Sequence, residues 1–509
     1  MSNLDLDNKG KKKIFEHSIV WLVILGIVGL SIRLYYFEPE LPITLDGLSY
    51  FLYAFDITKI GHLPENFTPS NNGWPIFVSL FFLISPFENA IEFMQLQKII
   101  SISLSTITII PVYFLCRKFF EKHYSLLGAA IFIFEPRIIQ NSLFGITESL
   151  YLLVGTITLV LFLSSRKLIY VSFALAALVT IVRAEGLFLF FAISILFIIK
   201  YRHDKTKILL KYGLALLIFV LILLPIAIYK IDIHGEDRII SRVSAGIEQE
   251  SQTFDKISVG SENFVKFLGW NMIPIFIFFI PIGSILFLKK INFQKLVIII
   301  TTVSMSLPAF YAYSIPALDS RFLFFLYPMF CVISLYAIKP LLEKISKQHI
   351  VIILIIVSII VASIVFLEIK KIDADYEEDA LQFSLKISDK ISGVNSYYPE
   401  DQYLASSVVI KNWPDVAVSD KYGNIKTNFV IIDTSGYSSL KEFIQDSQKK
   451  GLSHLVIDNN KNRPDFLKID PKEYSFLKSE HITEGLQNNY KGELYRIDYN
   501  EFFKVYNEK

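Results

Sequence analysis

The 509-residue sequence is 53% hydrophobic and 15% aromatic, and charged residues make up only 19% of it. Ordinary soluble domains are less apolar, so this composition favours solvation by a lipid bilayer over burial in one large core. The formal net charge of +2 gives no sign of nucleic-acid binding. Cys116 and Cys331 both lie in apolar runs, which excludes a disulfide framework and a CxxC metal site.

The first predicted element is a transmembrane helix that follows a basic tail. Residues 1–17 include four lysines between Lys9 and Lys13, and the apolar run 19–30 comes next. A signal peptide has the same charge pattern, but residues 31–36 supply aromatic anchors and no small-residue cleavage site. We therefore expect a retained first helix, with residues 1–17 as a cytoplasmic tail.

About eleven transmembrane helices are predicted, because a span needs roughly 20 apolar residues. The apolar segment 74–87 is too short to span and is bounded by prolines, so we expect an interfacial or half-inserted helix there. The candidate spans are 18–37, 97–117, 124–140, 147–164, 167–183, 186–200, 207–229, 268–288, 295–314, 321–338 and 348–368.

The distribution of Lys and Arg predicts the orientation of these helices. Every second connection between them is basic, and basic loops stay in the cytoplasm. Residues 18–368 are therefore predicted to form a transmembrane domain in the cell membrane, with outer loops at 38–96 and 231–267. The N-glycosylation sequon Asn66-Phe67-Thr68 is compatible with an outer first loop. The N-terminus is expected inside and the C-terminus outside.

Residues 369–509 are much more polar and read as an extracytoplasmic soluble α/β domain. Residues 429–433 resemble a buried strand, 438–450 an amphipathic helix closed by Gly451, and 454–458 a second strand. A strand, a helix and a strand in this order suggest a parallel pair. The predicted fold class is thus a polytopic α-helical membrane protein with a C-terminal α/β domain.

Isolated charges gather at the predicted outer ends of the helices, where the charge rule expects few. Ionisable groups are costly near the membrane, so they usually pair with one another or serve a site. One interpretation is that each arginine snorkels to lipid headgroups or makes a single structural ion pair. Because guanidinium binds phosphate with two parallel hydrogen bonds, a shared anionic, lipid-linked ligand is favoured for the group. The residues are Arg33, Arg137, Arg183 and Arg321, with Asp46, Glu135, Glu148, Glu185 and Asp319.

Local interpretations compete with this one at several positions. Asp46 opens a predicted interfacial helix that carries Tyr50 and is a candidate general base, but composition alone favours a helix N-cap. Thr147 can cap the helix that follows it, and Glu148 can interact with the dipole of that helix. Arg183 and Glu185 can pair with each other within one turn.

The order of these short motifs resembles GT-C fold glycosyltransferases, in particular archaeal-type members of the protein O-mannosyltransferase and aminoarabinose-transferase branch. The resemblance covers about residues 15–340. Where many relatives carry a second acidic residue after the first, this sequence has Gly47. The motifs are Asp46 to Tyr53, Asn72-Gly73-Trp74-Pro75, Glu135-Pro136-Arg137 with Thr147-Glu148, Arg183-Ala184-Glu185-Gly186 and Asp319-Ser320-Arg321.

The resemblance implies a glycosyltransferase that moves one hexosyl or pentosyl unit from a polyprenyl- or dolichyl-phosphate donor to an acceptor on the outer face. The acceptor class (protein, lipid or glycan) stays open, and a divalent cation, Mg²⁺ or Mn²⁺, is the one candidate cofactor. The alternatives are a membrane transporter or lipid flippase, and a non-catalytic scaffold. The resemblance implies catalytic roles for Asp46 and Glu148, donor-phosphate binding by Arg137, Arg183 and Arg321, and acceptor or other contacts for Tyr50, Glu185 and Asp319.

Overall fold

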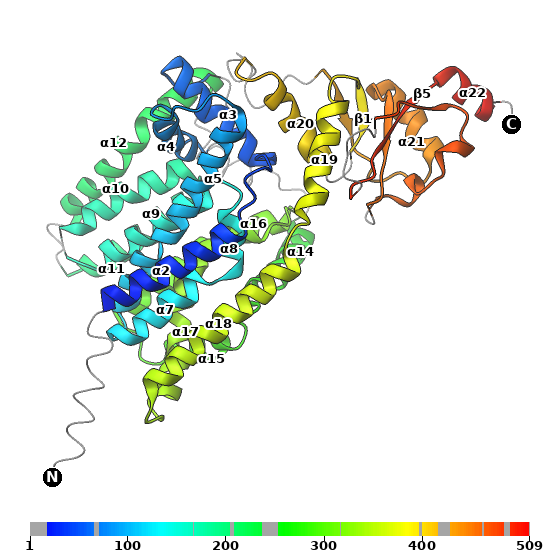
Figure 1. Cartoon of the computed structure of the whole chain (residues 1–509). Coiled ribbons are helices and arrows are strands. Elements are labelled where there is room, and N and C mark those ends of the chain that lie inside the picture. Colours follow the sequence, from blue (N-terminus) through cyan, green and yellow to red (C-terminus); the bar gives the residue numbers. More distant parts are fainter. Residues whose placement is uncertain are drawn as a thin grey trace, which may run out of the picture. The chain divides into compact units, whose positions relative to one another are not determined.

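The computed structural model describes most of the chain, which divides into two compact units (Figure 1). The helical unit comprises Met1–Phe37, Thr68–Val78 and Lys98–Lys371, and the α/β unit comprises Glu38–Phe67, Ser79–Gln97 and Ile372–Lys509. The predicted tail 1–17 and the sequon Asn66-Phe67-Thr68 lie outside the described residues. The described ranges are 18–65, 71–165, 167–203, 208–236, 253–315, 317–396, 400–415, 428–460, 463–482 and 489–507.

The helical unit consists mainly of helices in its described residues, and α4 and α5 each have residues in both units. Its elements in chain order are α2 (Ser18–Tyr35), α4 (Gly73–Phe82), α5 (Ala90–Ile107), α6 (Ile109–Arg117), α7 (Lys122–Ile133), α8 (Pro136–Ser142), α9 (Glu148–Phe162), α10 (Leu168–Val182), α11 (Gly186–Tyr201), α12 (Ile208–His234), α14 (Thr253–Met272), α15 (Phe279–Leu288), α16 (Phe293–Ser314), the 3₁₀ helix η1 (Ser320–Leu326), α17 (Tyr327–Leu342) and α18 (Gln348–Lys370).

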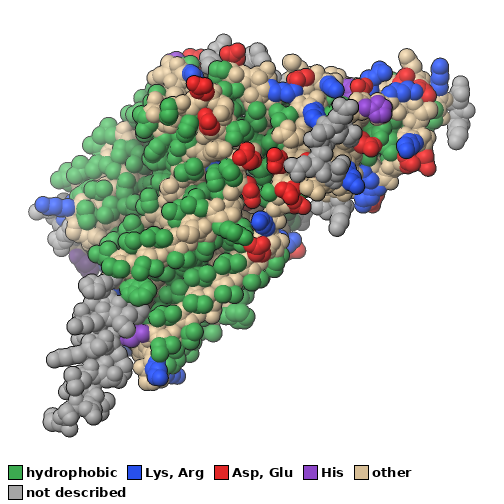
Figure 2. Space-filling view, in the orientation of Figure 1, with side chains coloured by type: hydrophobic (Ala, Val, Ile, Leu, Met, Phe, Trp, Pro, Cys, Tyr) green, Lys and Arg blue, Asp and Glu red, His purple; other side chains and the backbone are tan. Residues whose placement is uncertain are grey.

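Within the described ranges, six helical stretches are long and apolar enough to cross a membrane: Ser18–Tyr35, Ala90–Arg117, Ile208–Ile233, Phe293–Ser314, Ser320–Leu342 and Gln348–Ile387. Shorter apolar helices accompany them, so the count of eleven spans stays a prediction. Large hydrophobic side chains are exposed along these helices, for example Leu209 at 80% and Ile285 at 66%. Figure 2 shows hydrophobic side chains covering most of the visible face of the helical unit. This surface is typical of a multi-pass membrane protein.

Two predicted spans are broken in the structure, and proline accounts for both breaks. The span 124–140 divides into α7 and α8, because Pro136 cannot continue α7 and instead forms the first residue of α8. The span 268–288 divides into α14 and α15, with Pro274 between them. The segment 231–267, predicted as a polar outer loop, is helical from Thr253 onward. These breaks place Glu135 and Ile273 in turns between helices.

The α/β unit combines one helix of the first predicted outer loop with the C-terminal residues. Its sheet has the strand order β2-β1-β3-β5-β4. The elements are α3 (Leu45–Ile60), α19 (Ala374–Ile387), β1 (Gly393–Asn395), α20 (Glu400–Lys411), β2 (Val430–Ile432), α21 (Leu440–Ser447), η2 (Gln448–Lys450), β3 (His454–Ile457), η3 (Asp465–Leu467), η4 (Pro471–Glu473), β4 (Leu477–Ser479), β5 (Glu493–Ile497) and α22 (Tyr499–Asn507).

The two strands predicted in this unit are present as β2 and β3, and Gly451 ends the helix between them in a left-handed conformation, φ 93°. Both strands run parallel to β1, which lies between them, with Val394 paired to Ile431 on one side and to His454 on the other. The predicted orientation is therefore correct, but the strands are not neighbours. The short segment 393–395 gave no strand signal of its own. The domain boundary predicted at 368/369 stays a prediction.

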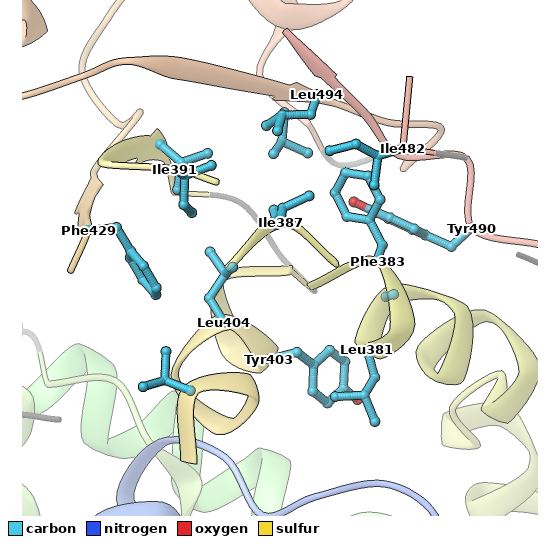
Figure 3. Packing of buried hydrophobic residues seen from close by; sticks show 14 residues of the cluster. Leu381, Phe383, Ile387, Ile391, Tyr403, Leu404, Phe429, Ile482, Tyr490 and Leu494 are labelled. Carbon is cyan, nitrogen blue, oxygen red and sulfur yellow. The ribbon is translucent and has the colours of Figure 1, made fainter. Parts of the chain in front are cut away.

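One face of this sheet packs on α19 and α20 through a fully apolar cluster (Figure 3). Phe383 and Ile387 of α19 and Leu404 of α20 are completely buried there, together with Val394 of β1. Tyr490 contacts Phe383 edge-on, with ring centroids 5.5 Å apart. Burial of side chains of this size contributes about 1.5–3 kcal/mol each, so this cluster stabilises the C-terminal fold.

Trp413, which follows α20, joins the C-terminal residues to α3 within the α/β unit. Its ring centroid lies 4.0 Å from that of Phe55 and 5.6 Å from that of Phe51, both on α3. The indole Nε1–H donates to the carbonyl of Glu88 at 2.9 Å. The Ser406 hydroxyl of α20 donates to the carbonyl of Ile43, just before α3, at 2.8 Å. The C-terminal residues thereby hold the helix that carries Asp46.

We expect Trp413→Ala to loosen α3, because truncating a packed tryptophan costs about 3–5 kcal/mol. Amide hydrogen exchange in residues 45–60 should accelerate at least about tenfold in the full-length protein. Trp413→Phe is the matched control, since it keeps ring contacts and loses only the hydrogen bond to Glu88, worth about 1 kcal/mol. Equal exchange in Trp413→Ala and the parent would show that the indole does not hold α3.

Candidate active site

Glu148 is the centre of an ionic network within the helical unit. It is the first residue of α9 and is only 1% exposed, and the dipole at that helix N-terminus favours its negative charge. Its Oε1 accepts a hydrogen bond from Nη1 of Arg183 and lies 3.9 Å from Nη1 of Arg321. Two guanidinium groups from segments far apart in the sequence therefore converge on one buried carboxylate.

Arg183 is positioned by the turn between α10 and α11. It is the C-cap residue of α10 in an extended conformation, which turns its side chain out of the helix. Its Nη2 lies 3.0 Å from Oε1 of Glu185, and its Nε donates to Oε2 of Glu185 at 3.4 Å. The close packing of this turn requires glycine at position 186, because a Cβ there would lie 2.5 Å from the backbone nitrogen of Thr180. The predicted pairing of Arg183 with Glu185 is correct, and Glu148 is a second partner.

Arg321 is positioned by its own turn at the start of η1. Asp319 caps η1, and its Oδ1 accepts the Arg321 backbone N–H at 2.8 Å. Its Oδ2 accepts the Nε–H of the same arginine at 2.6 Å. The Arg321 side chain is 31% exposed, against 11% for Arg183. Arg321 is thus the more accessible guanidinium of the network.

Thr147 and Tyr151 complete the surroundings of Arg183, and neither was predicted as a site residue. Thr147 is the N-cap residue of α9, as predicted, but its hydroxyl makes no capping hydrogen bond. Instead it accepts from Nη1 of Arg183 at 3.1 Å and donates to Oε2 of Glu148 at 3.3 Å. The guanidinium carbon of Arg183 lies over the Tyr151 ring, 5.6 Å from the ring centroid. The i, i+3 spacing from Glu148 was the available sequence signal for Tyr151.

The motif Asn72-Gly73-Trp74-Pro75 supports both elements of this network. The Trp74 indole is fully buried and donates to the carbonyl of Gly145, two residues before Thr147, at 3.0 Å. A Cβ on Gly73 would lie 2.8 Å from the backbone nitrogen of Val182, the residue before Arg183. The close approach of α4 therefore fixes the turn of Arg183 and the start of α9.

Two other predicted arginines do not belong to this network. Arg33 is fully buried and donates to the carbonyls of Gly29 and Ile133 and to the Ser105 hydroxyl at 3.0–3.1 Å. Arg33 lies in the last turn of α2, at the end of the first helix where it was predicted, and the hydrogen bonds described for it go to these interior acceptors. Arg137 is 4% exposed and lies 3.7 Å from Glu135. None of the contacts described for Arg137 reaches Glu148, Arg183 or Arg321.

Asp46 belongs to the α/β unit, where it is an exposed residue of the first turn of α3. The N-cap of α3 is Thr44, so the capping role considered for Asp46 is wrong. Leu45, immediately before it, has φ 50°, a strained conformation for a leucine of the kind that clusters at functional sites. The amide of Gln97 donates to the carbonyl of Gly47 at 3.2 Å and fixes this turn. Tyr50 is buried in the same helix.

Three carboxylates face two guanidinium groups in the Glu148 network, which we define as Thr147, Glu148, Arg183, Glu185, Asp319 and Arg321. Each carboxylate already pairs with an arginine, so a cation would have to compete with a guanidinium for it. Among the residues that the structure describes, no group of three or more His, Cys, Asp or Glu side chains could hold a metal ion. The chemistry that the network offers directly is anion binding by two converging arginines.

Solved structures with the same architecture were found, whereas no protein-family model and no curated protein sequence matches. The apo oligosaccharyltransferase of Archaeoglobus fulgidus is 12% identical, with a TM-score of 0.56 over 88% of this chain and 70% of that chain. ArnT of Cupriavidus metallidurans, bound to undecaprenyl phosphate, is 10% identical, with a TM-score of 0.54 over 94% of this chain and 98% of that chain.

The chain has the GT-C fold. The resemblance recognised from the motif order is therefore confirmed at the level of the fold. At 10–12% identity the likeness carries no information about individual side chains. In this GT-C fold the Glu148 network joins charged side chains of α9, of the turn before α11 and of the start of η1 around the buried Glu148.

Proposed function

We propose that this chain is a membrane glycosyltransferase that moves a single hexosyl or pentosyl unit from a polyprenyl- or dolichyl-phosphate donor to an acceptor on the outer face of the membrane. The observation that carries the proposal is the convergence of Arg183 and Arg321 on Glu148 in a GT-C fold. The similar solved structures support a lipid-phosphate donor. The ArnT structure holds undecaprenyl phosphate, and one structure of the Archaeoglobus fulgidus oligosaccharyltransferase, AglB, holds a dolichol-phosphate.

The donor phosphate is proposed to bind Arg183 and Arg321. Glu148 holds the two guanidinium groups together while no donor is bound, and phosphate oxygens then take over part of their hydrogen bonding. A guanidinium in a poorly solvated site stabilises the negative charge that grows on the leaving phosphate as the sugar departs. The ion pair between Arg321 and Glu148 is long, at 3.9 Å, and Arg321 is the more exposed of the two arginines. Phosphate therefore disrupts this pair more easily than the pair between Arg183 and Glu148.

The acceptor hydroxyl is proposed to lose its proton to Asp46 as it attacks the anomeric carbon, and the sugar–phosphate bond breaks with its electron pair left on the phosphate. Glu185 and Asp319 orient the two arginines through their ion pairs. Tyr50 and Glu148 are proposed to contact the acceptor side, and Mg²⁺ or Mn²⁺ is a candidate additional partner of Glu148. The C-terminal α/β residues and the reaction face lie outside the cell in this proposal.

The decisive experiment measures lipid phosphate release from purified, detergent-solubilised protein given polyprenyl-phosphate sugars. We expect release of free polyprenyl phosphate in step with appearance of the sugar on an acceptor, and loss of both in Arg183→Ala together with Arg321→Ala. Assays with EDTA and with added Mg²⁺ or Mn²⁺ decide the metal question. Transport of an intact sugar lipid without phosphate release would instead identify a flippase and overturn the proposal.

A further inference from the structure

The C-terminal end of α14 is bonded directly to the turn that presents Arg321. Asn271 lies in the last turn of α14 and is only 1% exposed. Its Nδ2 donates to the carbonyl of Ser320 at 3.0 Å. Ser320 is the residue between Asp319 and Arg321, so this bond holds the peptide from which the Arg321 side chain departs.

Asn271 is itself held in one orientation. The Tyr327 hydroxyl donates to the backbone carbonyl of Asn271 at 3.2 Å and to its Oδ1 at 3.3 Å. Tyr327 is fully buried at the start of α17. Because the amide oxygen accepts from Tyr327, the amide nitrogen faces Ser320, and the side chain cannot turn without leaving buried polar groups unpaired.

Arg137 fixes the same end of α14 from the other side. Its Nη1 donates to the carbonyl of Ile273, the first residue beyond the helix, where carbonyl groups have no partner within the helix. The guanidinium carbon lies 5.0 Å from the Trp270 ring centroid and 4.8 Å from that of Phe366. Glu135 pairs with Arg137 at 3.7 Å. The contacts described for Arg137 therefore connect Glu135 and Phe366 with the C-terminal end of α14.

A second connection runs from Phe267 of α14 to Asp319, the residue before Ser320. Phe267 stacks on Tyr313 with ring centroids 4.8 Å apart and an interplanar angle of 14°. The Tyr313 hydroxyl donates to the carbonyl of Asp319 at 2.9 Å. Two successive carbonyls of the Asp319-Ser320-Arg321 turn are thus connected to α14, that of Asp319 through Tyr313 and that of Ser320 through Asn271.

We infer that Asn271, supported by Arg137, is a positioning residue that sets Arg321 for the donor phosphate. This inference rests on the proposed function, and it replaces the predicted direct phosphate contact of Arg137 with an action through α14. A displacement of about 1 Å at a group that orients substrate can cost about 10²-fold in rate. The effect should therefore appear in donor recognition although Asn271 touches no substrate.

The test compares steady-state constants of the full-length enzyme for a polyprenyl-phosphate sugar. Asn271→Ala should raise the donor KM about tenfold and also lower kcat, since Arg321 is retained but misdirected both for donor binding and for the charge that grows on the leaving phosphate. Ser304→Ala is the matched control, because it also removes a hydrogen bond from a side chain to a backbone carbonyl between two elements. The Ser304 hydroxyl of α16 donates to the carbonyl of Phe188 in α11 at 2.7 Å. That control should leave the donor KM within about twofold.

A double-mutant cycle separates positioning from general destabilisation. If Asn271 acts through Arg321, Asn271→Ala combined with Arg321→Ala should raise the donor KM no further than Arg321→Ala alone. Fully additive effects would overturn the inference and leave the proposed function standing, whereas an unchanged donor KM in Arg321→Ala would contradict the proposed function itself. Should Asn271→Ala fail to fold, Tyr327→Phe releases the same amide at constant packing, and an unchanged donor KM there also overturns the inference.

Discussion

Asp46→Asn is expected to abolish sugar transfer while expression and membrane insertion stay unchanged. The substitution keeps the shape of the side chain and removes its capacity to accept a proton, and a positioned general base contributes about 10²- to 10⁴-fold to the rate. Asp46 is exposed at the start of α3, so a carboxamide of the same size at this position does not disturb the packing of a buried core. Turnover of a lipid-phosphate sugar by purified variant and parent measures the effect.

Glu40→Gln is the matched control for this prediction, because Glu40 is another exposed acidic residue of the connection between α2 and α4. It should retain nearly full turnover, whereas Asp46→Glu should recover part of the activity because it keeps a proton acceptor. Normal turnover by Asp46→Asn would remove Asp46 from the mechanism. Loss of turnover in both Asp46→Asn and Glu40→Gln would point to a general effect of negative charge in that loop.

Arg183→Gln should have the second large effect, on both activity and stability. Removing one donor to a developing oxyanion costs about 10²- to 10³-fold in kcat. Glu148 and Glu185 would also lose their shared cation, and breaking a buried ion pair on one side costs about 3–5 kcal/mol. Thermal unfolding can be followed by thiol labelling of Cys116 and Cys331, which are both buried in the helical unit.

A double substitution separates these two consequences of losing Arg183. Adding Glu148→Gln to Arg183→Gln removes the orphaned carboxylate, so much of the thermal stability should return while transfer stays low. Arg183→Lys should keep most of the stability and lose activity, because an ammonium group cannot make two parallel bonds to phosphate. Recovery of full transfer in the Arg183→Gln, Glu148→Gln enzyme would show that Arg183 is purely structural.

Local charge pairs could be predicted from neighbouring residues, but the network could not. Arg183 with Glu185 and Arg321 with Asp319 are each two residues apart, so one turn brings them together. The sharing of Glu148 by both arginines depends on the packing of α9 against η1 and the α10–α11 turn. Arg33 has no acidic residue two positions away, and only the structure shows that it donates to the carbonyls of Gly29 and Ile133.

The sequence by itself determined the membrane character and the GT-C resemblance, because hydropathy and motif order are both readable along the chain. Only the tertiary structure decided that two predicted spans are broken near Pro136 and Pro274 and that β1 lies between β2 and β3. It also decided that the Thr147 hydroxyl binds Arg183 and that Asn271 holds the Arg321 turn. The physical reason is that hydrogen bonds and ion pairs act over a few ångströms. Partners far apart in sequence become identifiable only once packing has brought them within that distance.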